Sequence, residues 1–221
     1  MERIVEPELM DDEAQACAYA EADFEAPNAH FVELYTEHVG PLPSGSAVLD
    51  LGCGPGDITL RIASMEPGIE VHGLDGSAAM LGYGRRALIS APALRIRVRF
   101  IEGLVPGATL PRDRYQAVVS NSLLHHLHEP AGLWQMVRES GAPGARVLVM
   151  DLMRPASEAA AQALIDEYAA NEPEVLRRDF YNSLLAAFEP AEVRAQLEAA
   201  NLGHFAVEAV SDRHLLVRGL L

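Results

Sequence analysis

The chemistry suggested by this sequence begins with a run of glycines and an acidic residue that follows it. Gly52, Gly54 and Gly56 form a G-x-G-x-G cluster after the short apolar run 47–49 and Asp50. Glycines between a strand and a helix let the backbone approach a ligand and direct the helix N–H groups toward it. Asp75 closes the next apolar run, where a carboxylate can accept hydrogen bonds from the hydroxyls of a ribose. Together these features predict a site for a ligand that carries a ribose.

Each feature also has a purely structural interpretation, which the sequence leaves open. The glycine cluster could be a tight turn alone. Asp75 could serve only to cap the helix that follows it, for which Ser77 is the expected N-cap residue. The G-x-G-x-G spacing also differs from the G-x-G-x-x-G pattern of dinucleotide dehydrogenases, which argues against a nicotinamide cofactor.

Three histidines, His125, His126 and His128, follow the fourth apolar run, where a substrate would approach in a sheet of this kind. Because histidine titrates near neutral pH, one of them could act as a general base, and His126 is our candidate. Packing of the loop is the alternative. Adjacent histidines with no acidic or cysteine cluster nearby lack the spacing of a metal site, so we predict no metal.

The elements that must position these residues alternate between strands and helices. Expected strands cover residues 47–49, 69–74, 95–101, 115–120 and 145–150, and the helices between them cover 57–63, 77–89 and 130–140. This alternation predicts right-handed crossovers and a parallel sheet. In the third strand, Arg95, Arg97 and Arg99 alternate with apolar residues, which is typical of an edge strand whose charges discourage aggregation.

The two ends of the chain are expected to be mostly helical. Residues 1–43 read as amphipathic helices, near 13–24 and 29–39, that end at Gly40-Pro41. Residues 156–189 read as wholly helical, with breaks near Pro173 and Pro190. A last helix at 191–200 precedes strands at 204–210 and 213–218, and their short connection predicts a hairpin.

Composition and charge limit the classes of function. The chain has 221 residues, a hydrophobic content of 49% and a formal net charge of −15. These values fit a globular protein whose surface repels phosphate backbones, so we expect no nucleic-acid partner. Two cysteines form no disulfide framework, and we see neither a secretory signal nor an apolar run of about 18 residues. We therefore expect a cytoplasmic protein that does not enter a membrane.

Four segments of the sequence resemble the motifs of one enzyme family. The segments VLDLGCGPGDITL at 48–60, VHGLDGSAAML at 71–81, YQAVVSNSLLHHLHEP at 115–130 and GARVLVMDLMRP at 144–155 resemble the core motifs of class I S-adenosylmethionine-dependent methyltransferases. The resemblance implies an α/β fold with a doubly wound, Rossmann-like sheet of seven strands. Their implied order is 3-2-1-4-5-7-6, with strand 7 antiparallel, under a helical cap.

The same resemblance implies a division of the chain into four parts. These are an N-terminal helical cap at 1–43, an S-adenosylmethionine-binding core at 44–155, a helical insertion at 156–189 that caps the substrate, and a C-terminal part of the core with the antiparallel hairpin at 190–221.

The resemblance also implies which residues bind S-adenosylmethionine. Asp75 would hold the ribose, and the glycine turn would surround the methionine part. The full implied set is Asp50, Gly52, Gly54, Gly56, Asp75, Gly76, Met80, Gly103, Leu104, Asn121, Ser122 and Leu123. Family members often carry an acidic pair after the third strand to bind the adenine amine. Glu102-Gly103-Leu104 stands there in this chain, so Glu102 or a backbone carbonyl would take that role.

The implied activity is transfer of a methyl group, by in-line displacement, to an oxygen, nitrogen, sulfur or carbon nucleophile of a small molecule, in a monomer or homodimer. Such a reaction depends more on positioning and on exclusion of water than on an acid–base residue. Tyr19 is a catalytic candidate beside His126, and Arg178 and Tyr181 in the helical insertion are substrate candidates. A methyltransferase-like binding or regulatory protein without turnover, and a nicotinamide-dependent oxidoreductase, are the alternatives.

Overall fold

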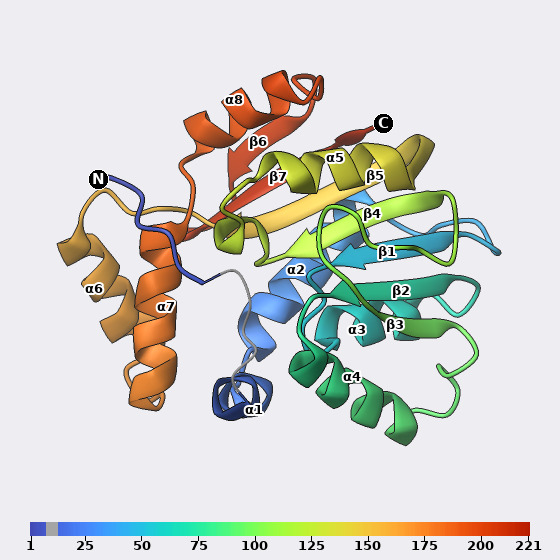
Figure 1. Cartoon of the computed structure of the whole chain (residues 1–221), viewed down its shortest axis with the longest axis horizontal. Helices are drawn as coiled ribbons and strands as arrows, with labels where there is room; N and C mark the ends of the chain where they lie inside the picture. The colour runs from blue at the N-terminus through green and yellow to red at the C-terminus, as the bar shows by residue number, and fades with distance from the viewer. Residues whose placement is uncertain (8–12) are drawn as a thin grey trace.

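A seven-stranded sheet runs through the middle of the protein (Figure 1). The computed structural model describes residues 1–7 and 13–221. The strands are β1 (Ala47–Leu51), β2 (Glu70–Asp75), β3 (Val98–Glu102), β4 (Tyr115–Asn121), β5 (Gly141–Leu152), β6 (Ala206–Ala209) and β7 (His214–Leu220). Their order is β3-β2-β1-β4-β5-β7-β6, with β7 antiparallel to both of its neighbours and the other pairs parallel. This confirms the fold class and strand order expected from the sequence.

Helices cover both faces of this sheet (Figure 1). They are α1 (Glu13–Glu21), α2 (Glu25–His38), α3 (Asp57–Met65), α4 (Ala78–Ser90), the short 3-10 helix η1 (Leu124–His126), α5 (Ala131–Ser140), α6 (Glu158–Tyr168), α7 (Glu174–Ala186) and α8 (Pro190–Ala199). Successive residues of β1 point to opposite faces: Val48 belongs to the same apolar cluster as Ile62 of α3, and Leu49 to that of Trp134 of α5. Burial on both faces explains why β1 is continuously apolar up to Asp50.

Helix α4 begins directly after β2 because Ser77 caps it. The Ser77 hydroxyl accepts a hydrogen bond of 3.2 Å from the backbone N–H of Met80 in the first turn. The serine cap expected from the sequence is therefore confirmed. Because the connection between β2 and α4 is short, Asp75, the last residue of β2, is held at the carboxyl edge of the sheet.

The third strand is shorter than the sequence predicts. Arg95 and Arg97 lie in the turn before β3, so only Arg99 belongs to the strand. Arg95 donates to two carbonyls in the last turn of α4, and Arg97 donates to carbonyls at the end of α3 and in the turn that leads into β2. The alternation of arginines is thus not a strand pattern, because two of them satisfy carbonyls that helix ends leave unpaired. β3 is nevertheless an edge strand, as expected.

Segments from distant parts of the chain gather beyond the carboxyl ends of the strands (Figure 1). Helix α6 packs against α7, and α7 contacts α1 and η1. Residues 1–7 are extended, and the Ile4 N–H donates to the Leu185 carbonyl at 3.0 Å. The expectation of helix throughout 1–43 is wrong for these seven residues, because their backbone bonds to α7 rather than to itself. Residues 8–12 of that expectation lie outside the described residues.

In the described parts of the chain, no helix is both long and apolar enough to cross a membrane. The division of the chain into a core, a cap and an insertion stays a prediction.

Candidate functional site

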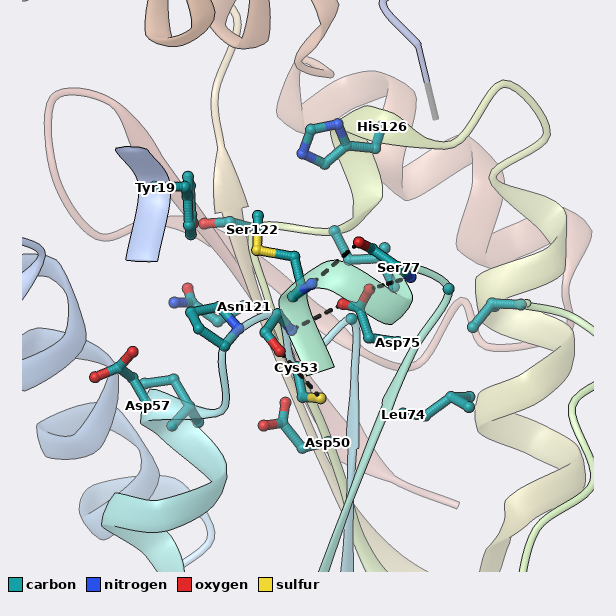
Figure 2. A pocket seen from close by; sticks show the side chains of 18 of the residues that line it. Tyr19, Asp50, Cys53, Asp57, Leu74, Asp75, Ser77, Asn121, Ser122 and His126 are labelled. Carbon is teal, nitrogen blue, oxygen red and sulfur yellow. Dashed lines mark hydrogen bonds between the residues drawn. The ribbon is translucent and has the colours of Figure 1, made fainter. Parts of the chain in front are cut away.

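A cavity opens at the carboxyl ends of β1, β2 and β4 (Figure 2). The space within it is about 1170 Å³ when the part that is open to solvent is included. β1 lies between β2 and β4, so the order of the sheet reverses there. Ligands of open α/β sheets bind at such a switch point.

The glycine turn forms the floor of this cavity. Gly52 and Gly54 have φ angles of +70° and +52°, and both line the cavity. A Cβ atom on Gly52 would lie 2.7 Å from the Cβ of Leu123, whereas one on Gly54 would have nothing within 4 Å. The turn therefore leaves open space over Gly54 that a ligand can approach closely.

Gly56, which was also expected to contact the cofactor, lies outside the lining. It precedes α3 with a φ of +89°, and a Cβ there would meet the ring of Phe100 at 2.4 Å. Its role in this structure is to let α3 pack against the neighbouring β3 and α4.

Asp75 faces the glycine turn from the end of β2. Its Oδ2 accepts a hydrogen bond of 2.8 Å from the Gly54 N–H, and its Oδ1 accepts one of 2.8 Å from the Ser77 N–H (Figure 2). These two bonds fix the orientation of the carboxylate at the cavity wall. Asp75 thus links the turn that follows β1 to the helix that follows β2.

The cavity is acidic. Asp50, Asp57 and Asp75 line it, and none of the described lining residues is lysine or arginine. Burial of Asp50 raises its pKa to about 7, and the negative charge of Asp75 adds to the rise, although the Thr59 hydroxyl donates to Asp50 at 2.6 Å. Such an arrangement favours a positively charged ligand, which stabilises the ionised carboxylates.

Two aromatic side chains from the N-terminal part of the chain also line the cavity. Tyr19 of α1 and Phe24, just before α2, have ring centroids 4.5 Å apart. Burial raises the pKa of Tyr19 to about 12, so its phenol is protonated at neutral pH. The Tyr19 hydroxyl can donate a hydrogen bond, but its pKa does not suit a general base.

Of the three histidines singled out in the sequence, His126 is the one that lines the described cavity. Its Nδ1 lies 3.2 Å from Oε1 of Glu6, and burial together with the nearby His125 holds the pKa of His126 well below its usual range. His125 is buried behind it, with Nδ1 2.6 Å from Oδ1 of Asp151. Burial opposes the charged imidazole, but the Asp151 carboxylate outweighs it and raises the pKa of His125. No local pattern in the sequence indicates that Glu6 would lie here.

The structure brings most of the predicted residues to one cavity. Those that line it are Tyr19, Asp50, Gly52, Gly54, Asp75, Gly76, Met80, Gly103, Leu104, Asn121, Ser122, Leu123 and His126. The cavity does not include Arg178 or Tyr181 of α7. Arg178 is exposed and pairs with Asp179 at 3.3 Å, and Tyr181 packs against the apolar cluster between α6 and α7.

Glu102 also lies outside the lining, whereas the next residue, Gly103, belongs to it. Sequence reasoning missed several residues that do line the cavity: Phe24, Asn28, Cys53, Asp57 and Val105. Cys53 and Asp57 could have been found, because they are part of or adjacent to the glycine turn. Phe24 and Asn28 reach the cavity through tertiary packing, which no local pattern indicates.

Residues 48–144 match the family model of a methyltransferase domain. The mitochondrial ubiquinone biosynthesis O-methyltransferase of Schizosaccharomyces pombe is 27% identical over 111 residues, which are 50% of this chain and 39% of that protein. The demethylmenaquinone methyltransferase of Thermus thermophilus is 31% identical over 109 residues, 49% of this chain and 48% of that protein. The chain therefore spans about half or less of the length of these two relatives.

Solved structures share the fold over nearly the whole chain. A SAM-dependent methyltransferase from Aquifex aeolicus has a TM-score of 0.68 at 16% identity, over 95% of this chain and 98% of that one. The plantazolicin methyltransferase BpumL, solved with a substrate analogue and SAH, has a TM-score of 0.71 at 13% identity, over 94% and 89%. Residues 48–144 thus match a methyltransferase domain, and the chain as a whole shares the fold and the sheet order of S-adenosylmethionine-dependent methyltransferases.

Proposed function

We propose that this chain binds S-adenosylmethionine in the cavity over the glycine turn and transfers its methyl group to a small molecule. The observation that carries the proposal is the charge of the cavity: three carboxylates surround the turn, and neither lysine nor arginine is among the described residues of the lining. S-adenosylmethionine is a sulfonium with an α-ammonium group, and both charges are attracted by such a site. The phosphates of a nicotinamide dinucleotide would be repelled by it.

The shape of the cavity supports a definite placement of the cofactor. The Asp75 carboxylate, held by Gly54 and Ser77, stands where it can accept hydrogen bonds from a ribose diol. The methionine part then lies over the open face of the glycine turn, close to Asp50. Met80, Gly103 and Leu104 line the part of the cavity where the adenine would pack.

When bound, the cofactor supplies an activated methyl group, so the chain needs to hold the acceptor in line with it and to exclude water. Tyr19 and Phe24, from the N-terminal part of the chain, line the cavity. Tyr19 can orient an acceptor by donating a hydrogen bond. The geometry gives little support to a general base at His126. Its Nδ1 lies 3.2 Å from the Glu6 carboxylate, and burial holds its pKa well below the usual range of histidine. We propose that His126 is a positioning residue that lines the part of the cavity where the acceptor binds.

The cofactor proposal is tested by calorimetric titration with S-adenosylhomocysteine and, in parallel, with NADH. Micromolar binding of S-adenosylhomocysteine without binding of NADH supports it. Failure of folded protein to bind S-adenosylhomocysteine, or preferential binding of NADH, overturns it.

Turnover is tested separately with labelled S-adenosylmethionine and a panel of acceptors. Because matched relatives are named for ubiquinone biosynthesis and for trans-aconitate, the panel includes phenols and small carboxylic acids. Cofactor binding without transfer to any acceptor of a broad panel would favour a binding protein that has the fold but not the activity.

A further inference from the structure

Three side chains from two distant segments converge beside the cavity. Oε1 of Glu6 lies 3.2 Å from Nδ1 of His126 and 3.6 Å from Nε2 of His125. The three possible ligand atoms all lie within 4.8 Å of one another. In a tetrahedral zinc site with bonds of about 2.0–2.1 Å, two ligand atoms are separated by about 3.3 Å. Both distances to Glu6 are therefore close to those that a shared metal ion would impose.

One of these three atoms makes no hydrogen bond with the described residues. Within the described part of the chain, the buried Nδ1 of His126 has no hydrogen-bond partner, although Glu6 is nearby. In the tautomer that carries its proton on Nε2, His126 presents the Nδ1 lone pair to the Glu6 carboxylate, 3.2 Å away. In that tautomer two acceptor atoms face each other in a buried place, and a cation between them would satisfy both.

Two of the three potential ligands are oriented by hydrogen bonds to neighbouring side chains, as ligands in metal sites usually are. Nδ1 of His125 lies 2.6 Å from the buried carboxylate of Asp151, so the proton of a neutral His125 belongs on Nδ1 and its Nε2 lone pair points toward Glu6. The Ser183 hydroxyl donates to Oε1 of Glu6 at 3.0 Å. A carboxylate behind a ligating histidine and a hydrogen bond to a ligating carboxylate are common supports of metal ligands.

We propose that Glu6, His125 and His126 bind a divalent transition-metal ion of the zinc class. Two imidazole nitrogens and one carboxylate oxygen suit zinc and, with it, cobalt and nickel, and they suit magnesium and calcium poorly. The site goes beyond the proposed methyl transfer, because none of its three ligands is needed to bind the cofactor.

The ion would join the N-terminal segment to the wall of the cavity. Glu6 belongs to the extended residues 1–7, which Arg3 already ties to the carbonyls of His125 and Leu127. Three protein ligands leave a fourth position for water or for an atom of the acceptor, as in catalytic zinc sites. Because His126 also lines the cavity, the ion would lie at the edge of the space in which the acceptor is expected.

The proposal is tested on the full chain, with any affinity tag removed and bound metal stripped by a chelator. Zn²⁺ is titrated by calorimetry, and Co²⁺ by its visible absorption, which reports coordination geometry without any need for activity. We expect one ion per chain, with a Kd of about micromolar or tighter, and the intense absorption of low-coordinate Co²⁺. Zn²⁺ should also raise the melting temperature.

Variants then locate the ion. Glu6→Gln and His126→Leu should each weaken Zn²⁺ binding at least about tenfold and remove the cobalt absorption. His204→Gln is the matched control, because His204 is an exposed histidine on another part of the surface and its loss should change nothing. Glu6 lies outside the apolar clusters, so Glu6→Gln should keep the circular dichroism spectrum of the wild type. Less than one ion per chain in the wild type would overturn the proposal. So would Zn²⁺ binding by both ligand variants that is as tight as that of the wild type.

Discussion

The carboxylate of Asp75 accepts a hydrogen bond of 2.8 Å from the backbone N–H of Gly54, across the gap between two neighbouring parallel strands. This bond joins the two sequence features that predict the site, the glycine turn after β1 and the acidic end of β2. It makes Asp75 both a candidate ligand for the ribose and a support for the turn over which we propose that the methionine part lies.

Substitution of Asp75 by asparagine should therefore weaken cofactor binding strongly. A lost hydrogen bond to a charged acceptor costs about 1.5–3 kcal/mol, so we expect the Kd for S-adenosylhomocysteine to rise about 10–150-fold. Calorimetry of wild type and Asp75→Asn measures this change. Glu102→Gln is the matched control, because Glu102 pairs with Asp75 in the sheet register but lies outside the cavity. Equal losses in both variants would mean that overall charge, and not the position of Asp75, determines the affinity.

The two glycines of the cavity floor should differ in their tolerance of a methyl group. Gly54→Ala should cost only the strain of a positive φ, about 1–2 kcal/mol, because nothing lies within 4 Å of the new Cβ. Gly52→Ala has the same strain and also brings a Cβ to 2.7 Å from Leu123, which adds about 1–3 kcal/mol. Denaturant unfolding of both variants should thus show the larger loss for Gly52→Ala. A larger loss for Gly54→Ala would contradict the geometry of the turn.

Affinity for S-adenosylmethionine should rise with pH through the titration of Asp50, whose pKa is raised to about 7 by burial. The positive cofactor stabilises the ionised carboxylate and lowers its pKa on binding, so protonation competes with binding. One pH unit below the pKa of the unliganded site, the affinity should be about tenfold lower than its high-pH plateau. Calorimetry between about pH 6 and about pH 8 covers this titration.

Asp50→Asn should bind more weakly at high pH and should lose the pH dependence, since asparagine does not titrate. Glu102→Gln again serves as the control and should keep the slope of the wild type. If the slope persists in Asp50→Asn, another group of the site is responsible for it.

The stability of the fold should fall in mild acid because of His214. This residue is buried at the start of β7, its Nδ1 lies 2.9 Å from the Ser211 hydroxyl, and burial lowers its pKa to about 4. Between the ordinary pKa of histidine and this value, the unfolded chain binds a proton that the folded chain does not. Stability is therefore lost as pH falls through that window, by up to about 3 kcal/mol.

Denaturant unfolding near the ordinary pKa of histidine and near the lowered pKa of His214 should show this loss of stability in the wild type. The loss should be smaller in His214→Gln. The exposed His204→Gln variant should behave as the wild type does. An unchanged pH dependence in His214→Gln would show that other groups cause the acid sensitivity.

Local sequence determined the frame of this protein and much of its site. The alternation of apolar runs and helices predicted the parallel sheet, and the resemblance of four motifs to a known family implied the strand order. The Ser77 cap was visible because helix capping depends on neighbours along the chain. Gly52, Gly54 and Asp75 were found for the same reason: each lies at the end of a strand, and parallel strands bring those ends to one edge of the sheet.

Tertiary packing decided the rest. Arg95 and Arg97 showed the period of a strand, but their guanidinium groups reach carbonyls of other segments, and no residue next to them indicates this. Glu6 lies beside His125 and His126 only because the extended N-terminal residues pair with α7. A periodic pattern encodes which face of an element is buried, and it does not encode which distant segment covers that face. The glycine turn that forms the floor of the cavity, together with Asp75, could therefore be predicted from the sequence, whereas the side chains that cover the cavity could not.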